Sequence, residues 1–78
     1  MKKIFYKCEQ YNIPMTETET HAEDPQDIAE ETIEEFADSL TLDDGDEVKF
    51  SIYDENKEIL GDFKAFVEFS YSFTVEEE

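Results

Sequence analysis

The dipeptide Asp24-Pro25 constrains the fold of this chain more than any other local feature. An Asp side chain immediately before a helix accepts hydrogen bonds from the unpaired N–H groups of the first turn. Proline suits the first helical position, where its missing N–H costs nothing. The apolar residues that follow recur with helical spacing, at Ile28, Ala29, Ile33, Phe36, Ala37 and Leu40. The sequence therefore predicts one amphipathic helix from Pro25 to about Leu40, with strand-like segments on both sides of it.

The segment before the helix has the pattern of two strands. Residues 3–11 are rich in β-branched and aromatic side chains, which favour a strand. Pro14 then interrupts the pattern, because proline lacks the N–H that a strand donates to its neighbour. Beyond it, threonines alternate with Glu or His from Thr16 to His21, which indicates a second strand at an edge of the sheet. The two segments form either a hairpin or one long bent strand.

The segment after the helix predicts a turn over 43–46 and a third strand over 48–53, where apolar residues occupy the even positions. Residues 54–57 then read as a hairpin loop. Apolar side chains occupy the odd positions of 63–75, which predicts one long fourth strand. Gly61, near its start, marks a β-bulge.

These elements predict an α+β fold in ββαββ order, a small antiparallel sheet of about four strands with one amphipathic helix packed on one face. The length fits a single domain over 1–75, and residues 76–78 read as a frayed acidic tail. Acidic chains are often disordered, but 38% of the residues are hydrophobic and 14% are aromatic. This composition favours a folded domain.

The charge of the chain narrows its classes of function. It has 23 Asp and Glu residues against six Lys and no Arg, which gives a net charge of −17. Small soluble domains carry net charges of magnitude about 2–8, and a larger excess destabilises the compact state through self-repulsion. This charge disfavours direct contact with nucleic acid or an anionic membrane. It favours a partner protein with a strongly positive surface, which is typical of proteins that bind nucleic acid.

The helix carries acidic residues, and no lysine, on its polar faces. Like charges three or four residues apart cost an isolated helix about 0.2–0.5 kcal/mol per pair. All six lysines lie in or beside the predicted strands instead. We therefore predict that the helix acids and the acids of the following turn bind the Lys and Arg side chains with which a partner holds phosphates. These residues are Asp27, Glu30, Glu31, Glu34, Glu35, Asp38, Asp43, Asp44 and Asp46. The alternatives are a solvated face that serves only solubility, and adaptation to high salt.

In its size, its charge, its lone cysteine and its acid-only helix beside a small sheet, the chain resembles the small acidic inhibitors that bacteriophages encode. These are the anti-restriction, anti-CRISPR and glycosylase-inhibitor proteins that imitate DNA. The resemblance implies a host-cytoplasmic protein that binds a nuclease, or a complex containing one, tightly and in a salt-sensitive way. The inhibitors do not share one fold, so the resemblance assigns no role to any residue of this chain.

Other chemistry finds little support in the sequence. The segment from Asp54 begins like a calcium-binding EF-hand loop, but Ile59 stands where that loop requires glycine. Weak, non-specific binding of divalent cations stays open. Cys8 and His21 are the only residues of their kinds, so they cannot build the usual zinc site. They would form a nucleophile pair only if neighbouring strands brought them together. We therefore expect no catalytic residues, no metal site and no cofactor.

The lone cysteine excludes an internal disulfide, which suits the cytoplasm, and no segment reads as a signal peptide or a membrane span.

The aromatic residues indicate a second possible function. If the odd positions of the last strand face the helix, Tyr53 and Phe66 lie on the opposite face of the sheet, where Phe5 and Tyr11 join them. An exposed aromatic patch there would mark a protein contact or a homodimer interface. The alternative function is thus a small phage or mobile-element interaction or assembly module that self-associates through this face. Its acidity would serve solubility only.

Overall fold

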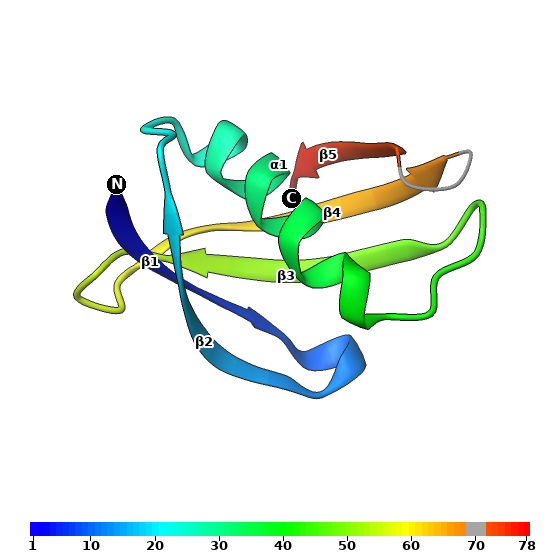
Figure 1. Ribbon diagram of the computed structural model, residues 1–78, viewed down its shortest axis with the longest axis horizontal. Helices are drawn as coiled ribbons and strands as arrows, with labels where there is room; N and C mark the ends of the chain where they lie inside the picture. The colour runs from blue at the N-terminus through cyan, green and yellow to red at the C-terminus, as the bar shows by residue number, and fades with distance from the viewer. Residues whose placement is uncertain (69–71) are drawn as a thin grey trace.

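The computed structural model describes residues 1–68 and 72–78. In chain order the elements are β1 (Lys2–Cys8), the 3-10 turn η1 (Glu9–Tyr11), β2 (Ile13–Thr20), α1 (Pro25–Phe36), the 3-10 turn η2 (Ala37–Ser39), β3 (Glu47–Tyr53), β4 (Ile59–Glu68) and β5 (Ser72–Glu77). The five strands form one antiparallel sheet in the order β2-β1-β3-β4-β5. The helix lies across one face of this sheet (Figure 1). The predicted α+β class is therefore confirmed, with one strand more than expected.

The first two strands form a hairpin, which decides between the two arrangements that the sequence leaves open. Lys2 pairs with Thr20 at one end of the hairpin, and Cys8 pairs with Ile13 at the other. The turn between them contains Asn12 in the left-handed conformation, with φ of 58°, which Asn tolerates better than most residues. As predicted, β2 is an edge strand.

The helix begins where the sequence predicts. The Asp24 side chain accepts a hydrogen bond from the Gln26 backbone N–H at 2.8 Å, and Pro25 is the first helical residue. The α-helical part ends at Phe36, and η2 continues the helical path to Ser39. The stripe of apolar residues faces the sheet, so the acidic residues are left on the outer side.

The predicted long fourth strand is wrong, because the chain reverses within it. Residues 59–68 form β4 and residues 72–77 form β5, and Glu68 pairs with Ser72 across the hairpin. The alternating pattern does not reveal the reversal, because both strands place their odd residues on the same face and the segment between them contains no Gly, Pro, Asn or Asp. Phe69 and Tyr71, two of the predicted core positions, lie outside the described residues.

The predicted frayed tail also differs from the structure. Glu76 pairs with Lys64, Glu77 pairs with Phe63, and the backbone N–H of Glu78 donates to the Asp62 carbonyl at 2.9 Å. The strand β5 therefore includes Glu76 and Glu77, which the sequence pattern places in the tail.

The core lies between α1 and the helix-facing side of the sheet. A line of aromatic rings runs through it from Tyr6 to Phe36 (4.9 Å between centroids), from Phe36 to Phe50 (5.4 Å) and from Phe50 to Phe63 (6.1 Å). The largest aliphatic side chains buried around these rings are Ile4, Ile28, Ile33, Val48 and Ile52. The other face of the sheet has no helix over it in the described residues and is called the open face below (Figure 1).

Candidate partner-binding surface

The acid face consists of six exposed carboxylates on α1 and η2, those of Asp27, Glu30, Glu31, Glu34, Glu35 and Asp38. They cover the outer side of the helix, which is the side that the apolar stripe leaves free. No lysine occurs anywhere from Ala22 to Val48, so the helix, η2 and the following loop carry negative charge only. The six predicted helix acids therefore do lie on one continuous surface.

Two carboxylates of the acid face are held in place by threonines of the edge strand β2. The Thr20 hydroxyl donates to Glu31 Oε2 at 2.7 Å, and the Thr18 hydroxyl donates to Glu35 Oε2 at 2.6 Å. Both threonines are buried, and the Thr20 hydroxyl also accepts a hydrogen bond from the Ala22 backbone N–H at 3.1 Å. These bonds fix Glu31 and Glu35 on the side of the helix that faces β2.

The negative charge of Glu35 also reaches the core. Together with burial, which is the larger cause, it raises the pKa of Tyr6 above its ordinary value of 10.0, while a hydrogen bond with Thr16 lowers that pKa. The sequence pattern identifies the threonines of β2 as strand residues but not as partners of the helix acids. A buried threonine on an edge strand beside a charged helix is the signal that would indicate such threonine–carboxylate bonds.

The remaining four carboxylates of the acid face, those of Asp27, Glu30, Glu34 and Asp38, project into solvent. Within residues 1–68 and 72–78, they make no hydrogen bond or ion pair. Glu30 lies one turn after Gln26, whose side-chain amide donates to the Val75 carbonyl of β5 at 2.6 Å. Glu30 and Glu34 are therefore on the side of the helix toward β5, away from the threonines, whereas Asp27 lies one turn before Glu31. All four carboxylates are open to a partner.

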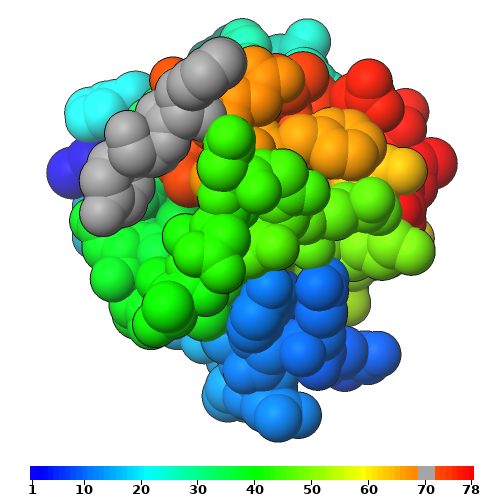
Figure 2. Space-filling model, turned by 90° about the vertical axis from the view of Figure 1, so that its right-hand side faces the viewer, coloured from blue at the N-terminus to red at the C-terminus, as the bar shows by residue number. Residues whose placement is uncertain are grey.

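The three acids of the 40–46 loop continue the negative surface past the end of η2, where the loop lies beside the end of β4 (Figure 2). Gly45 N–H donates to the Val67 carbonyl at 2.8 Å, and Val67 N–H donates to the Asp46 carbonyl at 2.9 Å. The Asp46 side chain accepts a bond from the Asp43 N–H at 2.8 Å and is half-buried. Asp46 therefore shapes the loop, while Asp43 and Asp44 are exposed.

Most lysines of the strands lie on the open face, so this side differs in charge from the acid face. Lys2 is the exception, because it lies at the start of β1 on the same side as the buried Ile4. Lys3, Lys7 and Lys64 form ion pairs with Glu17 (3.7 Å), Glu9 (3.0 Å) and Glu47 (3.7 Å). Lys49 stands directly opposite Lys64 in the sheet. These exposed pairs contribute little to stability, but they leave the open face with charges of both signs, in contrast to the acid face.

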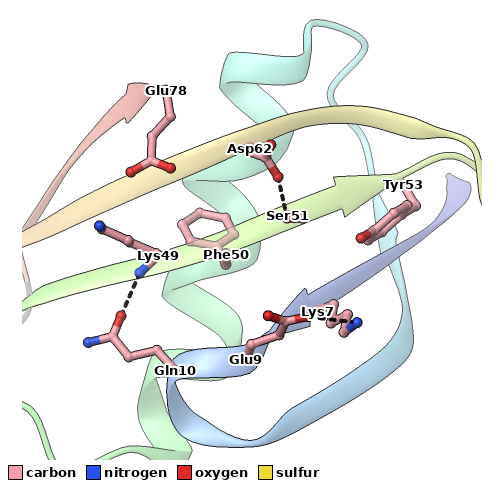
Figure 3. A pocket seen from close by; sticks show the side chains of 9 residues that line it. All are labelled: Lys7, Glu9, Gln10, Lys49, Phe50, Ser51, Tyr53, Asp62 and Glu78. Carbon is pink, nitrogen blue, oxygen red and sulfur yellow. Dashed lines mark hydrogen bonds and ion pairs between the residues drawn. The ribbon is translucent and has the colours of Figure 1, made fainter.

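A shallow depression on the open face has a volume of about 480 Å³ (Figure 3). Its polar groups bond mainly to one another: Gln10 accepts from the Lys49 backbone N–H at 2.9 Å, Ser51 donates to Asp62, and Lys7 pairs with Glu9. Two lysines and three acidic residues are part of its lining, so its wall carries charges of both signs.

The aromatic residues of the open face do not gather into one patch. Tyr53 pairs with Phe5 at one end of β3, whereas Phe66 pairs with Glu47 at the other end. Six residues of strand separate the two positions, or about 20 Å. Each group is half-buried and has a lysine ammonium 5.3 Å from a ring centroid, Lys57 over Phe5 and Lys64 over Phe66. Tyr11, the other aromatic residue expected on this face, packs against the core instead.

The remaining residues with reactive side chains are kept apart. Cys8 is buried, its thiol donates to the Lys49 carbonyl at 3.2 Å, and burial raises the pKa of the thiol. His21 lies at the opposite end of the β1–β2 hairpin, so the two residues do not form a nucleophile pair. The Asp54 carboxylate accepts bonds from the N–H groups of Asn56 and Glu58, at 2.8 and 2.9 Å, and so shapes the β3–β4 turn.

Across residues 1–68 and 72–78, no three His, Cys, Asp or Glu side chains are grouped so as to hold a metal ion. No helix in these same ranges has the length and apolar character that crossing a membrane requires. Comparison of the chain with protein-family models, curated proteins and solved structures gives no match.

Proposed function

We propose that this protein is a stoichiometric inhibitor that occupies the basic nucleic-acid-binding groove of a nuclease or a CRISPR effector complex. The observation that carries the proposal is the uninterrupted negative surface of the acid face and the 40–46 loop, which includes no lysine. In this role the protein imitates phosphate charge and needs neither a cofactor nor turnover. It acts in the cytoplasm of the host cell, as the resemblance to phage inhibitors implies.

The dimensions of the acid face suit such a role. The 12 residues of α1 extend over about 18 Å. This length corresponds to about five phosphates of one DNA strand, which carries one charge about every 3.4 Å along the axis. Acids three or four residues apart are separated by about 4.5–6 Å along the helix axis. A partner's Lys and Arg side chains would pair with these carboxylates and release bound counterions, as they do on phosphates.

Repulsion within the acid face also supports the proposal. The rows Asp27–Glu31–Glu35 and Glu30–Glu34–Asp38 place like charges four residues apart, which destabilises the helix. Lysines at some of these positions would relieve the repulsion and keep the protein charged enough for solubility. A positive partner surface offsets the repulsion only in the complex, so binding supplies a reason for the pattern that solubility does not.

The proposal is tested by a pull-down from lysates that contain restriction enzymes and CRISPR effector complexes, at two salt concentrations. We expect one nucleic-acid-binding protein to be recovered, and to be released by the higher salt or by competing DNA or RNA. Recovery of no basic protein, or of proteins that neither salt nor nucleic acid releases, would count against the proposal.

A second candidate function is self-association through the open face. It is favoured by the half-buried Phe5–Tyr53 pair and by Phe66. Under this alternative, Tyr53→Ser or Phe66→Ser changes the molecular mass measured by sedimentation velocity. The inhibitor proposal instead expects the same mass for the wild type and both variants.

A further inference from the structure

A hollow with a mixed apolar and polar lining lies beside the acid face, where η2 and the 40–46 loop meet the ends of β4 and β5. Its volume is about 420 Å³. Leu40, Leu42 and Phe73 in its wall are half-buried, and each packs on the core with part of its surface left accessible. Among the residues that the structure describes, the lining consists of Ala37, Leu40, Thr41, Leu42, Asp43, Asp44, Val67 and Phe73.

The border of the hollow is negative. Asp43 and Asp44 are part of its lining and are exposed. Asp38, the last member of the Glu30–Glu34–Asp38 row, directly follows the lining residue Ala37. No lysine lines the hollow among the described residues. The hollow thus combines apolar side chains with two exposed carboxylates, and its lining residue Ala37 is next to Asp38 of the acid face in the chain.

Charge alone gives the proposed inhibitor little selectivity. An array of carboxylates attracts any protein with a basic surface, because Coulomb attraction depends on charge and distance and not on shape. Tight interfaces obtain specificity from a few apolar or aromatic side chains that enter pockets, surrounded by a polar rim that excludes water. In the described residues the hollow is the feature of the negative surface with this anatomy.

We propose that the hollow accepts a large apolar side chain which the partner presents between lysines or arginines. The flanking cations pair with Asp43, Asp44 and the end of the acid face, while the apolar side chain is buried against Leu40, Leu42 and Phe73. This inference rests on the proposed function, and it adds a contact that a phosphate backbone does not offer. The hollow therefore lets the protein select one basic partner among many.

Two synthetic heptapeptides test the inference on the full chain. Both have three Lys or Arg residues on each side of the central position, which is Trp in one peptide and Ser in the other. Affinities are measured by isothermal titration at two salt concentrations, and the site by amide chemical shifts. We expect the Trp peptide to bind about tenfold more tightly, because a large apolar side chain leaves water. We also expect it to shift the amides of residues 40–44 and Val67.

Three variants separate the hollow from the charge. Leu42→Ala removes part of the apolar wall, and Thr41→Tyr fills the hollow from an exposed position without removing any core group. Leu60→Ala is the matched control, because Leu60 is also half-buried against the core but lines no part of the hollow. Leu42→Ala and Thr41→Tyr should each abolish the preference for Trp over Ser, whereas Leu60→Ala should retain it. Dispersed amide spectra establish that each variant is folded.

The outcomes distinguish the inference from the function on which it rests. Equal, salt-sensitive binding of the two peptides would overturn the role of the hollow and leave charge recognition intact. A preference for Trp that persists in folded Thr41→Tyr would also overturn it. Failure of both peptides to bind at low salt would contradict the inference together with the proposed function.

Discussion

Thr18 and Thr20 determine where two carboxylates of the acid face lie. Their hydroxyl groups donate to Glu35 and Glu31 at 2.6 and 2.7 Å, whereas the other four acids of the acid face, equally exposed, have no such partner in the described residues. Single positions of the acid face therefore differ in role. Charge reversal at Glu31 or Glu35 would disturb the packing of α1 on β2, so tests of binding belong at the other positions.

The Thr20–Glu31 bond gives a prediction for stability. Thr20→Val keeps the shape of the side chain but leaves the Ala22 N–H without its acceptor, so we expect a loss of about 1–2 kcal/mol in the free energy of unfolding. Glu31→Gln keeps an acceptor oxygen and removes one of the repelling charges, so it should cost less than about 0.5 kcal/mol. Unfolding by urea, which adds no ions, measures both. Thr41→Val, at an exposed position, is the control. A loss in Thr20→Val no larger than in this control would contradict the assignment.

Tyr6 makes the free energy of unfolding depend on pH. Burial and the charge of Glu35 raise its pKa above 10.0 in the folded protein. Its contribution to stability is therefore fully present below about pH 10, the unfolded value, and is lost as the pH rises through the folded pKa. Burial raises the pKa of Tyr11 and Cys8 as well, which adds to the same decline. Urea unfolding between pH 8 and pH 11 should show a smaller alkaline loss in Tyr6→Phe than in the wild type. An identical loss in both would exclude Tyr6 as a cause.

At the scale of the elements, the strand register is shaped by a bulge at the start of β4. Ile52 pairs with Gly61 and Tyr53 pairs with Ile59, so Leu60 is the extra residue, immediately before the glycine that the sequence singles out. Because Gly61 has no side chain, there is room for the Phe63 ring beside it. A Cβ there would lie 3.1 Å from Cε2 and 3.2 Å from Cζ of that ring.

Gly61→Ala should therefore destabilise the protein by about 1–3 kcal/mol, because the buried ring must shift within a packed core. The same substitution in a Phe63→Leu background should cost less, because the ring that it meets is gone. Thermal unfolding of the four proteins of this cycle measures the coupling. If the two substitutions are simply additive, close approach of the ring is not the reason for the glycine.

The sequence predicts elements well where a local signal is complete. Asp24-Pro25 locates the helix start, and the even positions of 48–52 locate β3 and its core face. It fails at the reversal between Glu68 and Ser72, because both strands continue one alternation and the segment between them has no Gly, Pro, Asn or Asp, and a single serine is a weak turn signal. The acid face follows from helical spacing alone. The threonine contacts and the hollow depend on how β2 and the 40–46 loop pack, which spacing along the chain does not encode.

At the scale of the whole molecule, the net charge of −17 lies on a body whose Cα radius of gyration is 11.5 Å. At an ionic strength of 0.1 M the screening length is about 10 Å, close to this radius, so salt screens repulsion between distant acids. Added salt should therefore stabilise the fold, because it weakens the repulsion between acids within the protein. It should lower the affinity for a basic partner, because it also weakens the attraction between the two proteins.

We expect the melting temperature to rise by at least about 4 °C between 10 mM and 500 mM NaCl, which corresponds to about 1 kcal/mol for a domain of this size. Scanning calorimetry measures it. A melting temperature that does not change over this range would mean that self-repulsion is not significant, and would remove one of the arguments for a basic partner.

The most direct test of the central claim is the affinity for the recovered partner of two charge-reversal variants with equal net charge. The acid-face variant is Glu30→Lys, Glu34→Lys and Asp38→Lys. The control variant is Glu19→Lys, Glu55→Lys and Glu58→Lys, at exposed positions outside the acid face.

We predict that the acid-face variant folds as stably as the wild type, or more so, and that its affinity falls by about 100-fold or more. The affinity of the control variant should fall by less than about fivefold, because this variant has the same net charge but keeps the acid face intact. Equal losses in the two variants would mean that the partner responds only to total charge. Undiminished affinity in the acid-face variant would contradict the proposal that these carboxylates take the place of phosphates.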